Sequence, residues 1–393
     1  MTMDELVGNV DAFPVLAKRD YFNHAGVSPM PRAVTDAVRG FLQHFEEDAF
    51  VGFDFTGPMD KLRHAAAGII KASADDIAIV SHTSDAISLV ALGLDLKPGD
   101  RVVINDGEYP ANVYPWTEAC NRSGATLVSV PETTTDAGEV IVREEDLLDA
   151  CDDPRTKILA VSHVQWGTGQ RMDIERLGAF CRERGILFSV DAIQSFGVVP
   201  NDVDKANIDF LQAGGHKWML GTMGAGVLYV RREKIEMLHP AAVGWGSVVN
   251  PFAWEEIDYT LRPTAHRYET GSPAFAPIIA VGTGLSMLHE LGIDAIHDRV
   301  TSLGDRFAAG IVEAGCTIVS PRGSTEQKSG SVCFTPPGDA EAAKSLYETL
   351  SKEHATELAS RCGRVRFAPH FYNTEDQVDR AVERVTVVLQ ESR

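Results

Sequence analysis

The chain has 393 residues, 44% of them hydrophobic and 23% charged. It is long enough for two packed cores, and it is not composed like a disordered or fibrous protein. Its 56 acidic and 36 basic residues give a formal net charge of −20, which repels nucleic acid backbones and anionic membrane surfaces. The composition therefore favours small-molecule partners, with no nucleic acid and no membrane among them.

The first residues and the cysteines bear on location. Residues 1–10 carry acidic side chains and lack the apolar stretch of a secretory signal, and no run of about 18 apolar residues occurs. The six cysteines include no CxxC pair, which is what a reducing compartment tolerates. The sequence predicts a cytoplasmic protein, and no residue pattern in it requires a metal.

Between residues 77 and 230, short β-branched runs alternate with amphipathic stretches, which is typical of βα units around a mostly parallel sheet. The predicted strands are 77–80, 101–105, 126–130, 158–162, 186–191, 210–213 and 226–230. The predicted helices are 32–45, 84–94, 112–123, 144–150 and 174–184. Strands this apolar need helices on both faces, so the predicted fold class is α/β.

After about residue 240 the sequence becomes rich in Gly, Pro and Trp, and then helices and strands return. The predicted helices are 278–291, 296–314, 340–352 and one that begins at 375, and the predicted strands are 317–319, 331–335 and 365–368. These elements indicate a smaller α/β domain that closes over the first. We predict an N-terminal segment (1–20), a large domain (21–255) and a small C-terminal domain (256–393).

The segment Gly214-Gly215-His216-Lys217-Trp218 follows an apolar strand and precedes a glycine-rich loop. A lysine at the end of a buried strand is costly unless its amine is used. Condensation with an aldehyde cofactor removes the charge, because a Schiff base needs the neutral amine. The alternative is an exposed loop lysine beside a tryptophan, and this segment alone favours neither interpretation.

Asp191 ends another apolar strand, and ligands of α/β sheets bind at the carboxyl ends of strands. A carboxylate there can pair with the protonated pyridine nitrogen of pyridoxal 5′-phosphate (PLP), which keeps the ring an electron sink. The alternative is a cap or turn aspartate. Thr83 and Ser84 open a predicted helix, whose N-terminus attracts a phosphate, although Ser84 is equally suited to be a plain N-cap. Only the combination is informative.

The order of these motifs resembles the class V aminotransferase family of fold-type I PLP enzymes, which includes cysteine desulfurases, kynureninase, isopenicillin N epimerase and cystine C–S lyases. The resemblance extends from Tyr21-Phe22-Asn23-His24-Ala25-Gly26 to the segment 366–374. It implies a PLP-dependent transferase fold of type I, in which the large domain binds PLP. It also implies an enzyme that acts at the α-carbon of a small amino acid through an external aldimine, by transamination, elimination or epimerisation.

The resemblance also implies roles for individual residues. Lys217 is the expected catalytic residue, as Schiff-base lysine and as the base and acid that shuttles the α-carbon proton. Asp191 is expected to hold the pyridine nitrogen, Gln194 the ring oxygen, and Tyr109 to stack on the ring. The residues expected to bind phosphate are Thr83, Ser84, His216 and, from the neighbouring subunit, Ser272. The last of these implies a homodimer with shared active sites.

The carboxylate of an amino acid substrate needs a planar, bidentate partner, which arginine supplies. Arg361 matches the position that desulfurases use, whereas Arg366 resembles the kynureninase arrangement and is favoured. His24, Trp166, Trp245 and His370 are further candidates for the pocket, and we assign His24 to substrate binding.

Two positions depart from the desulfurase pattern. Arg366 stands where an ungapped match places the nucleophilic cysteine, with Cys362 four positions earlier, and Gly214 replaces a serine that many desulfurases carry. These differences favour reaction at the α-carbon. Cysteine desulfurase or C–S lyase chemistry and a non-catalytic PLP-fold binding protein remain alternatives, and the substrate is left open.

Overall fold

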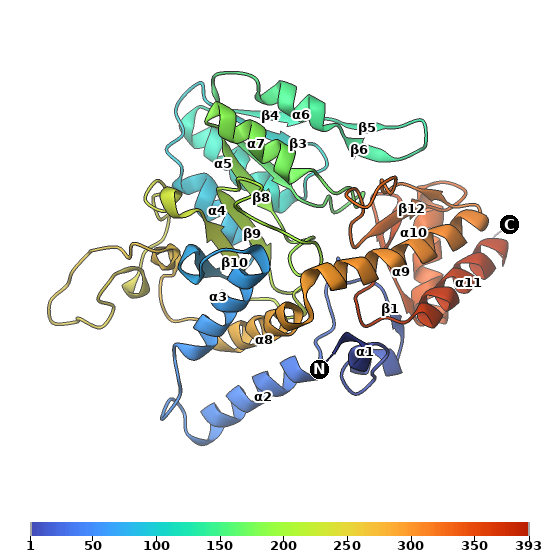
Figure 1. Cartoon of the computed structure of the whole chain (residues 1–393), viewed down its shortest axis with the longest axis horizontal. Helices are drawn as coiled ribbons and strands as arrows, with labels where there is room; N and C mark the ends of the chain where they lie inside the picture. The colour runs from blue at the N-terminus through green and yellow to red at the C-terminus, as the bar shows by residue number, and fades with distance from the viewer. Residues whose placement is uncertain (1, 392–393) are drawn as a thin grey trace.

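The computed structural model describes residues 2–391, and its centre is a seven-stranded sheet (Figure 1). The strand order is β2-β10-β9-β8-β7-β3-β4. β10 runs antiparallel to both of its neighbours, and the pairs from β9 to β4 are parallel. The strands are β2 (Ile77–Val80), β3 (Arg101–Asn105), β4 (Thr126–Val130), β7 (Thr156–Ser162), β8 (Leu187–Asp191), β9 (Phe210–Gly214) and β10 (Gly226–Val230). The predicted mostly parallel sheet is confirmed.

Helices cover both faces of this sheet, because successive side chains of a strand point to opposite faces. On β10, Val227 and Tyr229 join one buried cluster with α3, α7 and α8, whereas Leu228 and Val230 join another with α4 and α5. The helices around the sheet are α2 (Arg32–Glu47), α3 (Gly57–Ile70), α4 (Thr83–Gly93), α5 (Tyr114–Ser123), α6 (Glu144–Cys151), α7 (Ile174–Arg184) and α8 (Phe275–Leu291).

A second sheet with its own core lies toward the C-terminus, among the orange and red helices of Figure 1. Its antiparallel strands, in the order β11-β12-β15-β14, are β11 (Thr317–Ile318), β12 (Val332–Thr335), β15 (Arg364–Phe367) and β14 (Ala359–Arg361). The helices beside it are α9 (Ile293–Glu313), α10 (Ala340–Glu353) and α11 (Glu375–Glu391). Phe307 of α9 stacks on Phe367 of β15, with ring centroids 3.9 Å apart. The predicted smaller α/β unit is confirmed.

Several contacts cross the predicted domain limits. β1 (Asp20–Tyr21) pairs with β13 (Thr356–Glu357), and Phe22 lies in the C-terminal core. Helix α8, which follows the predicted limit at residue 255, packs against α2 and α3 of the central unit. The division at 20 and 255 therefore stays a prediction. The remaining elements are α1 (Met3–Leu6), the hairpin β5 (Glu132–Thr134) and β6 (Val140–Val142), and 3₁₀ turns at Pro14–Ala17, Ala74–Asp76, Pro110–Asn112, Arg232–Lys234, Trp245–Ser247 and Ala265–Tyr268.

The apolar character of α8 comes from its place in the core. Within residues 2–391 no single helix is long and apolar enough to cross a membrane, and α8 and α9 reach the required length and composition only as a pair bent by 87°. Ile278, Val281 and Leu285 of α8 are buried in the core cluster of the sheet.

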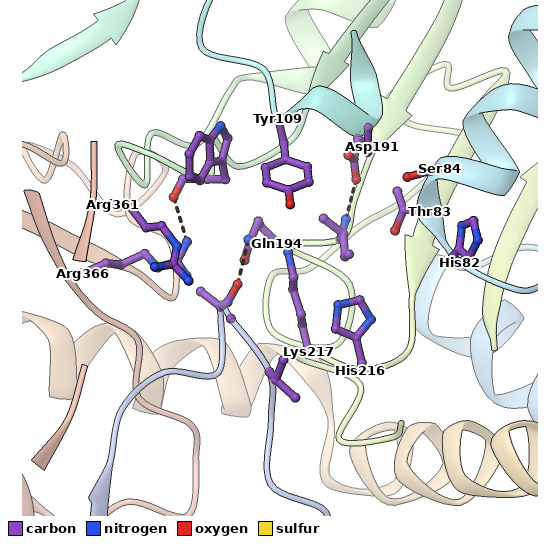
Figure 2. Close-up of a pocket in the computed structure, with 16 residues that line it drawn as sticks. His82, Thr83, Ser84, Tyr109, Asp191, Gln194, His216, Lys217, Arg361 and Arg366 are labelled. Atoms are coloured by element: carbon purple, nitrogen blue, oxygen red, sulfur yellow. Dashed lines mark hydrogen bonds between the residues drawn. The ribbon is translucent and has the colours of Figure 1, made fainter. Parts of the chain in front are cut away.

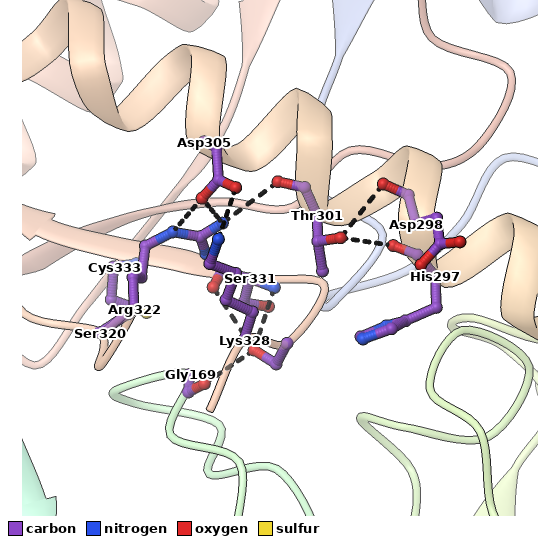
Figure 3. A network of polar contacts seen from close by, with 11 residues as sticks. Gly169, His297, Asp298, Thr301, Asp305, Ser320, Arg322, Lys328, Ser331 and Cys333 are labelled. Carbon is purple, nitrogen blue, oxygen red and sulfur yellow. Dashed lines mark hydrogen bonds and ion pairs between the residues drawn. The ribbon is translucent and has the colours of Figure 1, made fainter. Parts of the chain in front are cut away.

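The loop after β7 is held by the C-terminal unit. Four successive backbone carbonyls, those of residues 166–169, accept hydrogen bonds from side chains of that unit. The donors are Arg366 Nη1, Arg364 Nη1, Ser320 Oγ and Ser329 Oγ, at 2.8, 3.2, 2.6 and 2.7 Å. Figure 3 shows the hydrogen bond that joins Gly169 to the C-terminal unit. The loop is thereby fixed between the two sheets.

Candidate active site

A cavity of about 320 Å³ lies at the carboxyl ends of the parallel strands (Figure 2). In an α/β sheet this edge is where ligands bind, because the loops that leave neighbouring strands converge there. The predicted site residues that line the cavity are Thr83, Ser84, Tyr109, Asp191, Gln194, His216, Lys217, Arg361 and Arg366. The structure therefore brings together most of the residues that the sequence had separated by up to about 280 positions.

Lys217 extends from the loop after β9 into the middle of the cavity (Figure 2). Its Nζ lies 5.7 Å from the centroid of the Tyr109 ring. Burial and the positive charge of Arg366 lower the pKa of Lys217 to about 8, against the opposing attraction of Asp191. An amine with this pKa is partly neutral near pH 7, and the neutral form is the one that attacks a carbonyl.

Asp191 ends β8 with its side chain 2% exposed at the cavity wall. Its Oδ1 accepts a hydrogen bond from the backbone N–H of Ile193 at 2.9 Å. Burial raises the pKa of Asp191, and the negative charge of Glu108 raises it further, while the N–H of Ile193 opposes the shift. A carboxylate with raised proton affinity suits a cationic ring N–H, which it can hold by a charge-assisted hydrogen bond.

The N-terminus of α4 forms another end of the cavity. His82 caps this helix, with its Nδ1 accepting from Asp85 N at 3.0 Å, and the first N–H groups of a helix have no acceptor within it. Thr83 Oγ1 is buried and has no hydrogen-bond partner in the part of the chain that the structure describes. A Cβ on Gly214 would lie 3.1 Å from that oxygen and 3.3 Å from His216 Nδ1. An orphaned donor, a helix N-terminus and the space left by glycine together fit a phosphate.

Gln194 and Tyr109 complete the cofactor side. Gln194 Nε2 donates to Ala25 O at 3.0 Å and its Oε1 accepts from Trp218 Nε1 at 3.0 Å, so the amide is fixed at the cavity wall. Tyr109 is 47% exposed and contacts Trp166 edge-on, with ring centroids 5.3 Å apart and planes at 81°. A ring at this place offers its face to a planar cofactor above Lys217.

Of the two arginines, Arg366 is buried and Arg361 is exposed. Arg366 Nη1 donates to Trp166 O at 2.8 Å, while its Nε is buried without a partner in the described part of the chain. Burial lowers the pKa of Arg366 to about 10, which leaves it a cation near neutral pH. Arg361 Nη1 donates to its neighbouring carbonyl, Ser360 O, at 2.7 Å. A buried guanidinium with an unused N–H suits a substrate carboxylate better.

Two predicted residues do not line the cavity. His24 is fully buried, with Nδ1 2.7 Å from Ala368 O and Nε2 2.6 Å from Tyr372 Oη, so both ring nitrogens are engaged by the protein itself. His24 thus links the segment around residue 24 to residues 368 and 372, and its assignment to substrate binding stays a prediction. Ser272 is exposed, at a left-handed φ of 48°, on a turn outside the cavity.

Some lining residues were not assigned from the sequence. Ala25 and Gly26 line the cavity, although sequence analysis used them only as part of the family resemblance. The structure explains the glycine at position 26, because a Cβ there would lie 2.6 Å from Asn23 Oδ1. Trp166, named only as a further candidate, does line the cavity, whereas Trp245 and His370 do not.

Known proteins are similar to this chain in overall sequence and in fold. The family model for Aminotransferase class-V matches residues 20–380. A probable cysteine desulfurase of Pyrococcus abyssi is 29% identical over 387 residues, covering 93% of each chain, and an isopenicillin N epimerase of Streptomyces clavuligerus is 27% identical over 383 residues, covering 94% of each. The structure of an apo cysteine desulfurase from Thermococcus onnurineus NA1 has a TM-score of 0.86 at 24% identity, covering 100% of this chain and 99% of that one.

Fold and cavity together define an enzyme of the fold-type I PLP class. The chain belongs to the class V aminotransferase family. The predicted family and fold class are thereby confirmed, and PLP is the cofactor on which this family depends.

Proposed function

We propose that this protein binds PLP through Lys217 and catalyses transamination, elimination or epimerisation at the α-carbon of a small amino acid. One observation supports this proposal most directly. The amine of Lys217, whose pKa is lowered, and the buried carboxylate of Asp191 line the same cavity at the carboxyl ends of β8 and β9. An amine and an acid so placed suit the aldehyde and the pyridine nitrogen of the same flat cofactor.

When bound, PLP accepts the electrons that remain on the substrate α-carbon after one of its bonds breaks. Asp191 would keep the proton at the ring nitrogen, and the N-terminus of α4 with Thr83 would bind the phosphate. Lys217, once its amine is free again, would take the α-proton and return it as a general base and acid. Arg366 would orient the amino acid by its carboxylate, and the walls of the cavity would exclude water from the reacting atoms.

The position of Cys362 favours this chemistry over persulfide formation. Cys362 is exposed in the turn between β14 and β15 and does not line the cavity, where Arg366 stands instead. Attack on a substrate sulfur requires a thiolate within reach of that sulfur. Sulfide release from cysteine that persists in Cys362→Ser would identify a lyase.

The test is covalent trapping of PLP on the purified apoprotein at a series of pH values. Borohydride reduction is expected to leave the pyridoxyl group on the peptide that contains Lys217. Because only the neutral amine attacks and the pKa of Lys217 is lowered to about 8, the rate of attachment should rise about tenfold per pH unit below pH 8 and level off above it. A lysine of ordinary pKa would keep accelerating to about pH 10. Mass spectrometry and stopped-flow absorbance measure the two results, and labelling spread over surface lysines would refute the proposal.

We further propose that two copies form a homodimer with shared active sites. The loop between β10 and α8 projects from the body of the protein (Figure 1) and carries exposed side chains at Phe252, Trp254 and Ile257, which are 69, 78 and 92% exposed. An apolar surface of this kind on a globular protein marks an interaction site. Ser272 lies on an exposed turn whose Gly271 packs against Trp245 at the base of this loop, and this exposure supports the proposed contact of Ser272 with a neighbouring subunit.

Light scattering is expected to give twice the mass of the chain for the wild type. Substitution of Ile257 by aspartate should raise the dimer dissociation constant at least about tenfold, because it buries a charge in an apolar contact. Val312→Asp is the matched control, since Val312 is also exposed, at 52%, but lies on α9. A monomeric wild type, or equal effects of the two substitutions, would contradict the proposal.

A further inference from the structure

Glu108 is a buried carboxylate behind the cavity, 5% exposed and without a part in the chemistry above. Its Oε1 accepts hydrogen bonds from Asn105 Nδ2, Ser162 N and Gln165 Nε2 at 2.7, 2.6 and 3.1 Å. Its Oε2 accepts from Asn112 Nδ2 at 3.0 Å and from Ser162 Oγ at 2.5 Å. None of these partners is a cation. Among the described residues, five donors and no cationic partner surround the carboxylate.

This arrangement is that of a charged acceptor. The amides of Asn105 and Gln165 both point their N–H groups at Glu108. Their oxygens, Asn105 Oδ1 and Gln165 Oε1, are buried and accept no hydrogen bond from the described residues. A buried negative charge is costly unless its lone pairs are fully hydrogen-bonded, and here backbone, amide and hydroxyl groups from two segments, residues 105–112 and 162–165, satisfy them. Such a network rigidifies the groups that form it.

The network lies directly behind the two aromatic residues of the cavity. Tyr109 follows Glu108 in the chain and Trp166 follows Gln165, so the Glu108–Gln165 hydrogen bond joins the two segments at the bases of these rings. The rings contact each other edge-on, with centroids 5.3 Å apart, and both line the cavity. Glu108 is therefore connected to the segments that carry both rings.

We propose that Glu108 is a positioning residue that fixes Tyr109 and Trp166 as the aromatic walls of the site and keeps a negative charge behind Asp191. The inference rests on the proposed function, because the walls act on bound cofactor and substrate. The charged groups that act on Asp191 are Glu108, which raises its pKa after burial has done so, and Lys217, which lowers it. Glu108 thus affects the cavity both through the backbone and through its charge.

Glutamine at position 108 keeps the shape and removes the charge, but it cannot satisfy the same donors. If its amide nitrogen occupies the Oε1 position, it faces the backbone N–H of Ser162, which cannot turn. If it occupies the Oε2 position, it faces Asn112 Nδ2, which is fixed because Asn112 Oδ1 accepts from Trp116 Nε1 at 3.0 Å and an indole only donates. In either orientation two buried N–H groups face each other, and neither has an acceptor.

The experiment compares wild type, Glu108→Gln, Gln165→Ala and Asp106→Asn, each as apoprotein and loaded with PLP. Asp106 is the matched control, because it lies on the same turn, loses the same charge and is exposed. The measurements are circular dichroism of the apoproteins, the dissociation constant for PLP, the midpoint of the pH titration of the cofactor's visible absorbance, and the affinity for amino acids from the change in that absorbance.

Glu108→Gln is expected to lower the midpoint by on the order of half a unit to one unit, because a nearby negative charge favours protonated groups. It should also weaken amino acid binding about tenfold, through displaced walls. Gln165→Ala keeps the charge and should weaken amino acid binding without moving the midpoint, so it tests the positioning role even if Glu108→Gln does not fold. Asp106→Asn should match the wild type.

An unchanged midpoint and affinity in folded Glu108→Gln, beside a wild type that binds PLP, would overturn the role of Glu108 and leave the proposed function intact. Unchanged amino acid affinity in Gln165→Ala would overturn the link to Trp166. A wild type that does not bind PLP would overturn both the proposed function and this inference.

Discussion

Lys217→Ala is expected to lose covalent attachment of PLP and to reduce turnover of any amino acid substrate by at least about 10³-fold. Two functions disappear with one amine: the nucleophile that holds the cofactor, and the base that moves the α-proton, which alone contributes about 10²- to 10⁴-fold. The side chain is in the middle of the cavity, and no other lysine lines it among the described residues. Mass spectrometry after borohydride reduction and steady-state kinetics measure the two effects.

One further variant separates the amine from its charge, and a second is a control at an exposed lysine. Lys217→Arg keeps a cation but cannot form the imine, because a guanidinium is not deprotonated in proteins, so it should be as inactive as the alanine variant. Lys71→Ala removes an exposed lysine whose Nζ pairs with Asp202 Oδ2 at 3.1 Å, and it should behave as wild type. A borohydride-stable adduct in Lys217→Ala would assign the attachment to another residue.

Strands were the most predictable part of the fold. The predicted range 126–130 coincides with β4, a partly exposed edge strand. The ranges 101–105 and 226–230 coincide with β3 and β10, because these strands are buried on both faces and are therefore continuous apolar runs bounded by polar turns. Such a signal is local. It depends on burial on both faces and needs no knowledge of which strands are neighbours.

Helix α3 was missed because its stability depends on contacts with residues far away in the sequence, which a local pattern does not contain. It was not predicted, although its exposed residues Asp60, Lys61, His64 and Gly68 recur every three or four positions, while its other face packs in the core and against α8. Arg63 is buried there in an ion pair with Glu269 at 2.5 Å, and a Cβ on Gly68 would lie 2.5 Å from the His289 ring. A charged residue on the buried face and a glycine inside the helix both weaken the amphipathic pattern, and both are explained only by partners about 200 residues away.

The site divides in the same way. Lys217, Asp191 and Thr83 could be predicted, since each lies where an apolar strand ends and the carboxyl ends of such strands meet. The network of Glu108 could not, because the donors of Ser162 and Gln165 are more than 50 residues away in the chain and meet Glu108 only through the tertiary fold. His24 was placed in the pocket from its motif alone, and only its contacts with residues 368 and 372 give it a position in the fold.

Arg366→Gln is expected to lower kcat/KM for the amino acid substrate by about 10²- to 10³-fold. Removing one partner of a buried, hydrogen-bonded charge pair costs about 2–5 kcal/mol, and the substrate carboxylate would be left in a buried cavity without its guanidinium. Arg366→Lys should recover little of the loss, because an ammonium is a point charge and does not reproduce two parallel hydrogen bonds. Arg361→Gln should cost less than about tenfold, since Arg361 is exposed and its charge is screened by solvent.

Arg366 also holds the loop of Trp166, through the hydrogen bond from its Nη1 to Trp166 O. An amine that lacks the α-carboxylate but carries the same side chain separates the two roles. If Arg366 binds the carboxylate, wild type and Arg366→Gln should differ far less in affinity for this amine than for the amino acid, as measured by the absorbance of bound PLP. Equal losses of affinity for both ligands would mean that Arg366 acts through the loop. A larger loss in Arg361→Gln than in Arg366→Gln would assign the binding of the substrate carboxylate to Arg361. The unused, buried Nε of Arg366 favours the first result, because a donor in that position lacks a partner until an anion enters the cavity.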